Sequence, residues 1–585
     1  MRGAALRGAL PFAAIFGAGL LLPAVSNNYW TLIATRAAIY WVLVSGLNLV
    51  VGYAGQLAIG WVALLTLGAY TASVLALGNA LPEVPVPLAF AAACLVGAVF
   101  GLVVGLPALR LRTFYFAMTT LGFATIVTQV ALAWQEVTGG GIGVPGPSLP
   151  PPFDTSLGFY LLCLGLAALA TWMTANVAYS RFGRALVAIR DAEVAAEAAG
   201  IGKPRLLGAV FLFSGALAGL AGGLFATLQS YITPEAFTFD LSVLFFIAIL
   251  IGGRGSILGP LVATVGLTLL PEFAAPLVVW STFLYAALLL VIVLAVPGGI
   301  AALLDARRHR PLPPDRTILP RPELLPEVLG PETSSGPIVL RNVVLRFGGV
   351  RAIDGLDLTI ERGKVHGLIG PNGSGKTTTL NVICGFYAPR EGEVTLDGAK
   401  LPANAPQARG PAGIARTFQT PRLVGEASVL QNVMVGGMIR GRASFLESLL
   451  ALPRHRRDEA ALRAAGLLAL HAVGLASLAE ARADRLQHSE LRFMEIARAL
   501  MLRPRFLLLD EPAAGLSTEE IRRLGALIRA VAEAGTGVLL VEHHADLIFD
   551  ICDEVTVLNL GRELAAGTPA EIRVHREVVS AYLGG

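Results

Sequence analysis

Long apolar runs fill the first half of this 585-residue chain, and charged positions are rare within them. A helix needs about 17 to 25 mostly apolar residues to cross a bilayer. The pattern therefore predicts a polytopic all-α membrane domain with about ten spans over residues 1–304. The predicted spans are 9–25, 31–51, 56–78, 86–109, 114–134, 157–180, 206–229, 238–252, 256–270 and 274–296.

The pattern changes in the second half, where short apolar segments alternate with charged sequence. The segments 364–369, 505–510 and 536–542 are predicted to be buried strands. Residues 337–585 therefore form the second predicted domain, with an α/β fold. Between the two domains, residues 305–336 are rich in proline. This composition predicts an extended, fairly stiff tether with no chemistry of its own.

Composition and charge narrow the class of protein. Hydrophobic residues make up 55% of the chain, charged residues make up 15%, and the net charge is +4. This charge is small and no basic stripe interleaves with aromatic residues, so the sequence does not predict nucleic-acid binding. The four cysteines are scattered, which predicts neither a disulfide nor a metal site.

A glycine-rich loop follows the first predicted strand and opens a predicted helix, Lys376–Phe386. This order of strand, loop and helix is the context in which the motif G-x-x-x-x-G-K-T forms a P-loop, whose backbone amides cradle phosphates. Lys376 is predicted to reach the β- and γ-phosphates, and the Thr377 hydroxyl to ligate Mg²⁺. The predicted nucleotide-binding residues of this P-loop NTPase domain are Gly370, Asn372, Gly373, Ser374, Gly375, Lys376, Thr377 and Thr378.

Acidic and histidine residues follow the other two predicted strands. Asp510 is placed to hold Mg²⁺, and Glu511 comes next, where a carboxylate can orient and deprotonate an attacking water. An isolated Asp-Glu pair is usually a surface turn, but its place after an apolar strand and a P-loop favours catalysis. His543, preferred over His544, is predicted to contact the γ-phosphate. The sequence therefore predicts an ATPase that uses ATP and Mg²⁺.

Basic residues predict the membrane topology. An ATPase domain lies in the cytoplasm, so residues after 304 are predicted to be on the cytoplasmic side, called inside here. Loops rich in Lys and Arg are usually cytoplasmic, and the basic loops of this chain fit the same topology. Arg2 and Arg7 place the N-terminus inside too. The first run also fits a cleaved signal peptide, but a retained span suits the topology better. The arrangement requires 238–252 and 256–270 to be separate crossings around an inside Arg254. The other predicted inside residues are Arg110, Arg112, Arg181, Arg184, Arg190, Lys203, Arg205, Arg307, Arg308 and Arg310, and the predicted outside residues are Glu83, Glu136, Asp154, Glu235, Asp240 and Glu272.

Two segments predict specific packing. Gly215, Gly219 and Gly223 lie on one face of a predicted span, and small residues at this spacing favour close helix contacts in lipid. The charged stretch 181–204 lies between two apolar runs and is predicted to be a short amphipathic helix that an ATPase domain grips, rather than only a solvated loop. This stretch includes Glu197, Ala198, Ala199 and Gly200.

The membrane half resembles the permease subunits of bacterial branched-chain amino-acid ABC importers. The resemblance runs in order through nearly all of 30–300 and implies that 181–204 is the coupling helix that docks on an ATPase subunit. Trp61 departs from the pattern, because the family leads us to expect histidine there. The matching segments are 48–56, 68–70, 120–123, 138–140, 183–185, 188–191, 252–256 and 259–260.

The second half, about 337–584, resembles the ATP-binding cassette of the same importers. The resemblance implies that Phe347 stacks on adenine. It places Gln419 in the Q-loop, where the side chain senses Mg²⁺ and the γ-phosphate and touches the coupling helix. Residues 513–517 match the D-loop, with serine where asparagine is expected at its end, and 581–584 match the C-terminus of the subfamily.

The signature motif departs from the family pattern, in which LSGGQ caps the γ-phosphate bound by the opposite subunit. A serine hydroxyl and backbone amides at a helix N-terminus do this. Glu490 is therefore expected to add negative charge near an anion and to oppose closure. The altered residues are Gln487, His488, Ser489 and Glu490.

This departure predicts an asymmetric pair of ATP sites. The Walker A loop of this chain, with Glu511 intact, is completed by a normal signature from a partner and hydrolyses ATP. The partner's Walker A loop, which faces 486–490, is slow or inactive. Restoring serine, glycine and glutamine at positions 487, 489 and 490 is expected to raise turnover.

The sequence thus favours a fused permease–ATPase subunit that imports branched-chain or related small amino acids across the bacterial inner membrane. The family implies a second permease, a second ATP-binding subunit and a periplasmic solute-binding protein. Alternatives are import of urea, amides or aromatic acids, a homodimeric exporter, or an ATP-gated membrane protein that does not pump. An exporter fits the many short, glycine-rich spans poorly. Intramembrane Asn48, Gln56, Thr120 and Gln129 either line a substrate path or satisfy neighbouring helices.

Overall fold

The computed structural model describes residues 2–78, 83–111, 113–274, 298–305, 316–331 and 336–580, with isolated positions between 283 and 313. The chain divides into two compact units. The first, called the membrane unit, comprises Met1–Arg190, Lys203–His309 and Ser448–Ala451. The second, called the ATPase unit, comprises Asp191–Gly202, Arg310–Glu447 and Leu452–Gly585.

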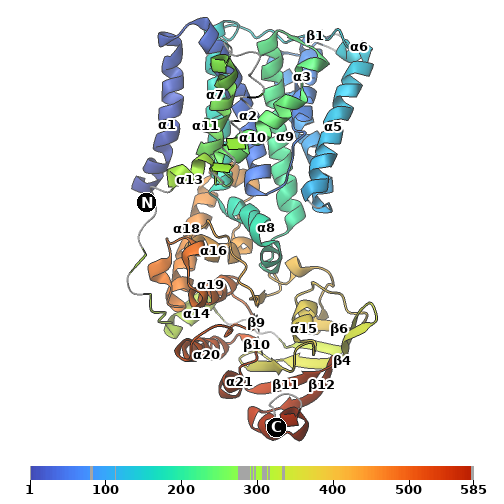
Figure 1. The fold of residues 1–585 in the computed structure, drawn as a ribbon, viewed down its shortest axis with the longest axis vertical. Coiled ribbons are helices and arrows are strands. Elements are labelled where there is room, and N and C mark those ends of the chain that lie inside the picture. Colours follow the sequence, from blue (N-terminus) through green and yellow to red (C-terminus); the bar gives the residue numbers. More distant parts are fainter. Residues whose placement is uncertain are drawn as a thin grey trace. The chain divides into compact units, whose positions relative to one another are not determined.

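The membrane unit is a bundle of apolar helices, one for each predicted run from 9–25 to 256–270 (Figure 1). Its main helices are α1 (Arg2–Val25), α2 (Asn28–Asn48), α3 (Val62–Leu77), α4 (Val86–Gly105), α5 (Thr113–Ala133), α7 (Ser156–Ala178), α9 (Lys203–Gln229), α10 (Phe239–Gly252) and α11 (Leu258–Ala274). Its shorter elements are η1 (Leu49–Tyr53), η2 (Leu106–Leu109), α6 (Gln135–Thr138), β1 (Val144–Pro145), β2 (Tyr231–Ile232), η3 (Pro234–Ala236) and α13 (Gly299–Asp305).

Helix length limits the number of membrane crossings. Six described helices are long and apolar enough to cross a membrane, and three further apolar helices, Leu10–Val25, Val62–Leu77 and Leu258–Phe273, are shorter. The predicted count of ten spans is therefore not confirmed. α10 and α11 are separate helices, as predicted, and Arg254 lies in the turn between them. Outside the described residues lie nearly all of the predicted run 274–296 and the predicted positions Arg112, Arg307, Arg308, Arg310 and 581–584.

α3 begins at Val62, rather than near residue 56, because the chain from Gly55 to Gly60 is not helical. Thr120 Oγ1 accepts hydrogen bonds from the Ile59 and Gly60 amides, each at 3.2 Å. A Cβ added at Gly60 would lie 1.9 Å from the Thr120 carbonyl oxygen. A side-chain hydroxyl on a neighbouring helix thus satisfies backbone amides that a helix would otherwise pair.

The predicted small-residue packing of α9 is confirmed. A Cβ added at Gly215 would lie 2.1 Å from the Gly97 carbonyl oxygen, and one at Gly219 would lie 2.1 Å from the Ala93 carbonyl oxygen, both on α4. Gly223 continues the contact against an aromatic side chain of α4. The two backbones touch directly, so larger residues at these positions would push the helices apart.

Two short strands join loops that the charge pattern assigns to the same side of the membrane. β1 pairs antiparallel with β2, with Val144 opposite Ile232. β1 and α6 lie at one end of the helix bundle, and the N-terminus lies at the other end (Figure 1). This arrangement agrees with the prediction that Arg2 is inside whereas Glu136 and Glu235 are outside.

The ATPase unit contains two sheets. The larger has the order β12-β11-β5-β10-β9-β8, parallel except for β12, and the smaller is antiparallel with the order β4-β3-β6-β7. The predicted strands correspond to β5 (Val365–Ile369), β9 (Phe506–Asp510) and β10 (Gly537–Val541), all fully buried. The remaining strands are β3 (Ile338–Phe347), β4 (Val350–Ile360), β6 (Glu391–Leu396), β7 (Ala399–Lys400), β8 (Ile414–Arg416), β11 (Glu554–Asn559) and β12 (Arg562–Gly567).

Helices pack on these sheets and form two apolar cores, a larger one with strands of the larger sheet and a smaller one that includes strands of both sheets. The parallel strands of the larger sheet end near the loops that carry the predicted catalytic residues. The helices are α14 (Leu325–Leu329), α15 (Lys376–Ile383), α16 (Val429–Gly436), α17 (Phe445–Leu449), α18 (Pro453–Ala472), α19 (His488–Leu500), α20 (Thr518–Glu533), α21 (Ala545–Ile551), α22 (Pro569–Val574) and α23 (Arg576–Val578).

The proline-rich linker is part of the ATPase unit where it is described, over 316–331. Ile318 and Leu325 are buried in the main core of this unit. Arg523 Nη1 donates a hydrogen bond of 2.9 Å to the Ile318 carbonyl oxygen. The prediction of an extended tether therefore does not hold for 316–331, because its apolar side chains find partners in the core.

The predicted amphipathic segment forms α8 (Arg181–Ala198), which breaks at Ala192 (φ −147°, ψ 53°). The part before the break belongs to the membrane unit, whereas Asp191–Gly202 belongs to the ATPase unit. Gly200, with φ +83°, follows the end of the helix, and Pro204 already lies in the first turn of α9. The segment 191–202, called here the coupling segment, is thus built into the ATPase unit.

Candidate active site

The glycine-rich loop leaves β5 and enters α15, as predicted, although α15 ends at Ile383 rather than Phe386. Gly370 and Gly375 have φ values of +148° and +106°. A Cβ added at Gly370 would lie 2.2 Å from the Leu558 carbonyl oxygen. The loop therefore needs glycine for both its backbone conformation and its close packing.

Lys376 lies beneath this loop and is 6% exposed. Its Nζ donates hydrogen bonds to the carbonyl oxygens of Gly370 at 2.7 Å and Pro371 at 2.9 Å. Burial lowers the pKa of Lys376, while the nearby carboxylates of Glu511 and Asp510 oppose this shift. The ammonium group is thus held at the concave side of the loop. The neighbouring predicted residues Asn372, Gly373 and Thr377 are exposed, and Thr378 is half-buried.

Asp510 ends β9 and is 2% exposed. Its Oδ2 accepts a hydrogen bond of 2.9 Å from Arg416 Nη2. Burial raises the pKa of Asp510, and the Arg416 guanidinium opposes this rise. The Asp510 Oδ1 and Ser374 Oγ atoms are buried and have no hydrogen-bond partner within the described part of the chain. An unpaired carboxylate oxygen beside a P-loop fits the oxygen ligands that Mg²⁺ prefers.

Glu511 contacts the two other residues that are predicted to be catalytic, Gln419 and His543. Its Oε2 accepts a hydrogen bond of 2.6 Å from Gln419 Nε2, and its Oε1 lies 3.0 Å from His543 Nε2. Glu511 also has a left-handed backbone, with φ +48°. Such strain is costly for a residue other than glycine and often occurs at functional sites. The carboxylate is therefore held between an amide and an imidazole at the end of β9.

Sequence reasoning missed Glu542, which is 1% exposed at the end of β10. Its Oε1 accepts a hydrogen bond of 2.6 Å from the Ala513 amide, and its Oε2 accepts one of 2.9 Å from the His543 amide. Glu542 thus fixes the backbone at Ala513 and at His543, the histidine that is predicted to be catalytic. The sequence signal was a carboxylate directly after an apolar strand. The contact with Ala513 could not be predicted, because the two residues are far apart in the sequence.

Phe347, predicted to stack on adenine, ends β3 and is 47% exposed. Its ring meets Tyr387 edge-on, with centroids 5.1 Å apart. An exposed aromatic pair is compatible with stacking on a planar base. His544, which was not preferred, is the residue before α21 and is exposed.

The altered signature residues are anchored within the ATPase unit. Gln487 precedes α19 and forms a capping box with Glu490. His488 Nε2 lies 3.0 Å from the carbonyl oxygen of Ala514 in the D-loop. Ser517 contributes most to lowering the pKa of Glu520, and Ser489 lies close to the Glu520 side chain and helps to lower it. The motif is thus tied to the D-loop and to α20 of its own chain.

The Glu490 carboxylate is not exposed to solvent, and whether it opposes a bound anion stays a prediction. Its side chain is fully buried. Its Oε1 accepts a hydrogen bond of 2.8 Å from Arg316 Nε, its Oε2 pairs with Arg316 Nη2, and the Gln487 amide donates to its Oε2 at 2.7 Å. The guanidinium of the linker offsets the carboxylate.

Buried charges connect α19 to the Q-loop. Arg492 Nη1 donates a hydrogen bond of 3.0 Å to the Phe418 carbonyl oxygen. Glu495 Oε1 accepts hydrogen bonds from the Arg422 amide at 3.1 Å and from Arg498 Nη2 at 3.0 Å. Burial raises the pKa of Glu495, and these partners oppose the rise. The backbone around Gln419 is therefore fixed to α19, the helix that begins in the signature motif.

The coupling segment contacts the residue next to Gln419. Ala192, Ala195 and Ala198 form an apolar cluster with Phe418. A Cβ added at Gly200 would lie 3.0 Å from the Pro411 side chain. The predicted coupling residues Glu197, Ala198, Ala199 and Gly200 thus all lie in or beside a helix turn that packs on the ATPase core.

The intramembrane polar residues have different surroundings. Asn48 Nδ2 donates to the Ser256 carbonyl oxygen at 2.7 Å, and Gln56 Nε2 donates to the Ala54 carbonyl oxygen at 3.3 Å. Together with Thr120, these residues satisfy backbone groups inside the bundle. Gln129, in contrast, lines a cavity. Trp61 is buried, and its Nε1 donates to Ser214 Oγ at 2.9 Å.

Comparisons with known proteins match both halves of the chain. Residues 29–296 match the family described as the branched-chain amino acid transport system permease component. Residues 353–514 match the ABC transporter family, and 562–585 match the branched-chain amino acid ATP-binding cassette transporter family. BraF of Pseudomonas aeruginosa, a high-affinity branched-chain amino acid transport ATP-binding protein, is 40% identical over 252 residues, which are 43% of this chain and 99% of BraF. The chain belongs to the branched-chain amino acid ABC transporter family.

Two further relatives support this assignment. LivG of Salmonella typhimurium, also a high-affinity branched-chain amino acid transport ATP-binding protein, is 37% identical over 248 residues, which are 42% of this chain and 97% of LivG. LivG of Escherichia coli is 36% identical over 252 residues, which are 43% of this chain and 99% of that protein. This ABC transporter chain joins a permease domain to an ATP-hydrolysing domain that binds ATP, and the resemblance found in the sequence is confirmed.

Proposed function

We propose that the chain is the fused permease–ATPase subunit of an importer that moves branched-chain or related small amino acids across the bacterial inner membrane. One observation carries the proposal, since the permease half and the cassette half match families of the same transport system. The chain supplies one permease domain, about 1–304, and one cassette, about 337–585. It works with a second permease, a second ATP-binding subunit and a periplasmic solute-binding protein.

The geometry around Glu511 supports a mechanism for ATP hydrolysis. Lys376 and the loop amides hold the phosphates, and Thr377 and the free oxygen of Asp510 hold Mg²⁺. When bound, Mg²⁺ neutralises charge on the phosphate oxygens. Glu511 removes a proton from the attacking water, while Gln419 and His543 hold its carboxylate in place.

Contacts of the coupling segment support a route from ATP to the membrane helices. The alanine cluster of this segment packs on Phe418, which precedes Gln419 in the chain. Gln419 in turn holds Glu511. A change in the position of Gln419 on hydrolysis therefore reaches Phe418 and the segment that continues into α9.

The altered signature supports two unequal ATP sites in the assembled transporter. Gln487 and Ser489 stand where the family has a serine and a glycine, so the site completed by this motif lacks the usual hydroxyl. The Walker A loop of this chain is the active one, because its Lys376, Asp510 and Glu511 are all present and grouped.

Uptake of labelled leucine tests the proposed function. The full chain is expressed in cells with its neighbouring transporter genes, beside a Lys376→Ala variant. Unlabelled isoleucine, valine, urea and benzoate serve as competitors. We expect uptake that the variant abolishes and that isoleucine or valine blocks. Uptake that only urea or benzoate blocks would contradict the proposed amino-acid substrate. ATP-dependent efflux of leucine would contradict the proposed direction of transport.

A further inference from the structure

A cavity of about 600 Å³ lies in the membrane unit between α5 and the segment that leads into α10. Its volume is in the range of small-molecule sites, which hold about 300–1,000 Å³. α5 contributes Leu121, Thr125, Thr128 and Gln129. A second hollow of about 640 Å³ shares Thr125 and Gln129, so these two side chains stand between both spaces.

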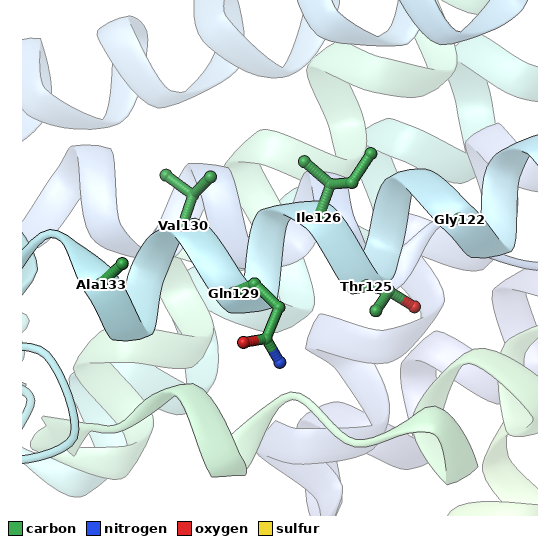
Figure 2. A pocket seen from close by; sticks show the side chains of 6 residues that line it. All are labelled: Gly122, Thr125, Ile126, Gln129, Val130 and Ala133. Atoms are coloured by element: carbon green, nitrogen blue, oxygen red, sulfur yellow. The ribbon is translucent and has the colours of Figure 1, made fainter.

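Two polar side chains of α5 that line the cavity, Thr125 and Gln129, face the same way (Figure 2). Gln129 and Thr125 project from the same side of the helix, and Ile126 and Val130 project from the opposite side (Figure 2). Gln129 is exposed, and α5 carries no charged residue. An uncharged polar side chain at such a position is unfavourable against lipid and usually faces another subunit, water or a solute.

Ser242 of α10 supplies a second, independent observation. It lines the cavity and is 1% exposed, yet its Oγ has no hydrogen-bond partner among the residues that the structure describes. A buried hydroxyl without a partner is unfavourable and calls for an explanation. A solute that accepts or donates a hydrogen bond in the cavity would satisfy it.

Charge and apolar surface define the solute that fits. Among the described residues that line the cavity, Glu235 is the only one with a charged side chain, and it is acidic. A negatively charged solute would be repelled, whereas an ammonium group would be attracted. Leu121, Phe237 and Phe239 provide apolar walls for an aliphatic or aromatic side chain.

We propose that this cavity is a substrate-binding site on the permeation path. It takes small solutes with an ammonium group and an apolar side chain, such as neutral amino acids, and excludes aromatic acids without an amine. Glu235 attracts the ammonium group, and Ser242 and Gln129 donate hydrogen bonds to the carboxylate. The inference rests on the proposed function and narrows its substrate class. Glu235 lies in a loop predicted to be outside, so the cavity admits solute from that side.

Thiol labelling tests the site independently of uptake. Gln129→Cys, at an exposed position, is made in the full transporter in cell membranes and treated from outside with a charged, membrane-impermeant thiol reagent. Of the four natural cysteines, Cys163, Cys384 and Cys552 are buried and Cys94 is partly exposed, so the unmodified chain gives the background. Thr119→Cys is the matched control, because Thr119 is on α5 but does not line either cavity.

We expect the reagent to label position 129 but not 119, and leucine or alanine to slow labelling at 129 by about tenfold at saturation. Benzoate is expected to have no effect. If neither amino acid protects, or if benzoate protects equally, the site is not the one proposed. Protection by alanine without any leucine uptake would keep the cavity as an amine site and overturn only the branched-chain substrate.

Substitutions give a second readout. Gln129→Leu and Ser242→Ala are expected to lower amino-acid uptake by about tenfold, because each removes a hydrogen-bond donor from the site. Thr119→Val removes a hydroxyl that donates to the Tyr115 carbonyl oxygen and is expected to leave uptake within about twofold. Uptake by Gln129→Leu and Ser242→Ala that equals uptake by the control would overturn the proposal, provided all variants reach the membrane in equal amounts.

Discussion

Arg316 and Glu490 form an ion pair between the proline-rich linker and the altered signature motif. Arg316 Nε donates a hydrogen bond of 2.8 Å to Glu490 Oε1, and Arg316 Nη2 also donates to the Arg485 carbonyl oxygen at 3.1 Å. Glu490 is fully buried, whereas about a fifth of the Arg316 side chain is exposed (21%). The linker of this fused chain therefore stabilises the N-terminus of α19.

Removal of Arg316 is expected to destabilise the ATPase unit. Arg316→Ala leaves a buried carboxylate without its cation, which we expect to cost about 2 kcal/mol, less than for a fully buried pair because Arg316 is partly exposed. Thermal unfolding of the full chain in detergent measures the change. Arg463→Ala, which breaks the exposed pair with Glu480, is the matched control and should cost less than about 1 kcal/mol. Equal effects of the two substitutions would contradict the buried pairing.

Repair of the signature motif is expected to raise the activity of the partner's ATP site. Gln487→Ser with Ser489→Gly restores a hydroxyl and a small residue without disturbing the Arg316–Glu490 pair. A Lys376→Ala background silences the site of this chain, so the remaining hydrolysis reports the other site. We expect an increase of about tenfold. Unchanged hydrolysis in the assembled transporter would count against the asymmetric pair.

Glu490→Gln distinguishes the effect on turnover that the sequence predicts from the effect on stability that the structure predicts. The family pattern has glutamine there, so sequence alone predicts a gain in turnover. The structure predicts a loss of stability instead, because Arg316 would lose its carboxylate partner. Unfolding and ATP hydrolysis are measured on the same purified transporter. A gain in turnover with unchanged stability would show that the ion pair has no structural role.

Glu511→Gln tests the proposed base. The amide keeps the size of the side chain but cannot accept a proton, so we expect hydrolysis to fall by about 10²- to 10⁴-fold while ATP still binds. Nucleotide binding is measured in parallel to exclude unfolding. His543→Ala is expected to have a smaller effect, because His543 only positions the carboxylate. Hydrolysis that persists in Glu511→Gln would assign proton removal to another group.

Gly200 and Gly202 offer a matched pair in the coupling segment. Gly200 has a left-handed φ of +83° and an added Cβ would lie 3.0 Å from Pro411 and Ile439, whereas an added Cβ at Gly202 meets no atom within 4 Å. Gly200→Ala is therefore expected to reduce uptake per ATP hydrolysed by about tenfold, and Gly202→Ala to change it less than twofold. Equal coupling in both variants would remove Gly200 from the route.

Local patterns predicted much of the ATPase site. The strands that end at Ile369, Asp510 and Val541 are short, mostly apolar and fully buried, so their ends and the residues that follow could be predicted from the sequence. The contacts of Arg316 and Glu542 could not, because each joins residues far apart in sequence through buried polar groups. The spacing of hydrophobic residues along the chain does not indicate such a pairing.

The membrane unit was predicted less completely. Apolar runs located its helices, and the spacing of Gly215 and Gly219 located the contact with α4. Composition does not reveal that Thr120 binds the amides of Ile59 and Gly60, so the chain before α3 was predicted to be helical. The number of crossings also depends on helix lengths, which hydropathy alone leaves open.

The most direct test of the central claim is leucine uptake and ATP hydrolysis measured together in vesicles. The vesicles contain the full chain with its partner subunits and binding protein, and ATP on the cassette side. Leucine uptake that requires ATP, rises with the binding protein and stops in the Glu511→Gln variant is the predicted result. Hydrolysis that continues without any ATP-dependent movement of leucine into the vesicles would contradict the assignment of this chain as an amino-acid importer.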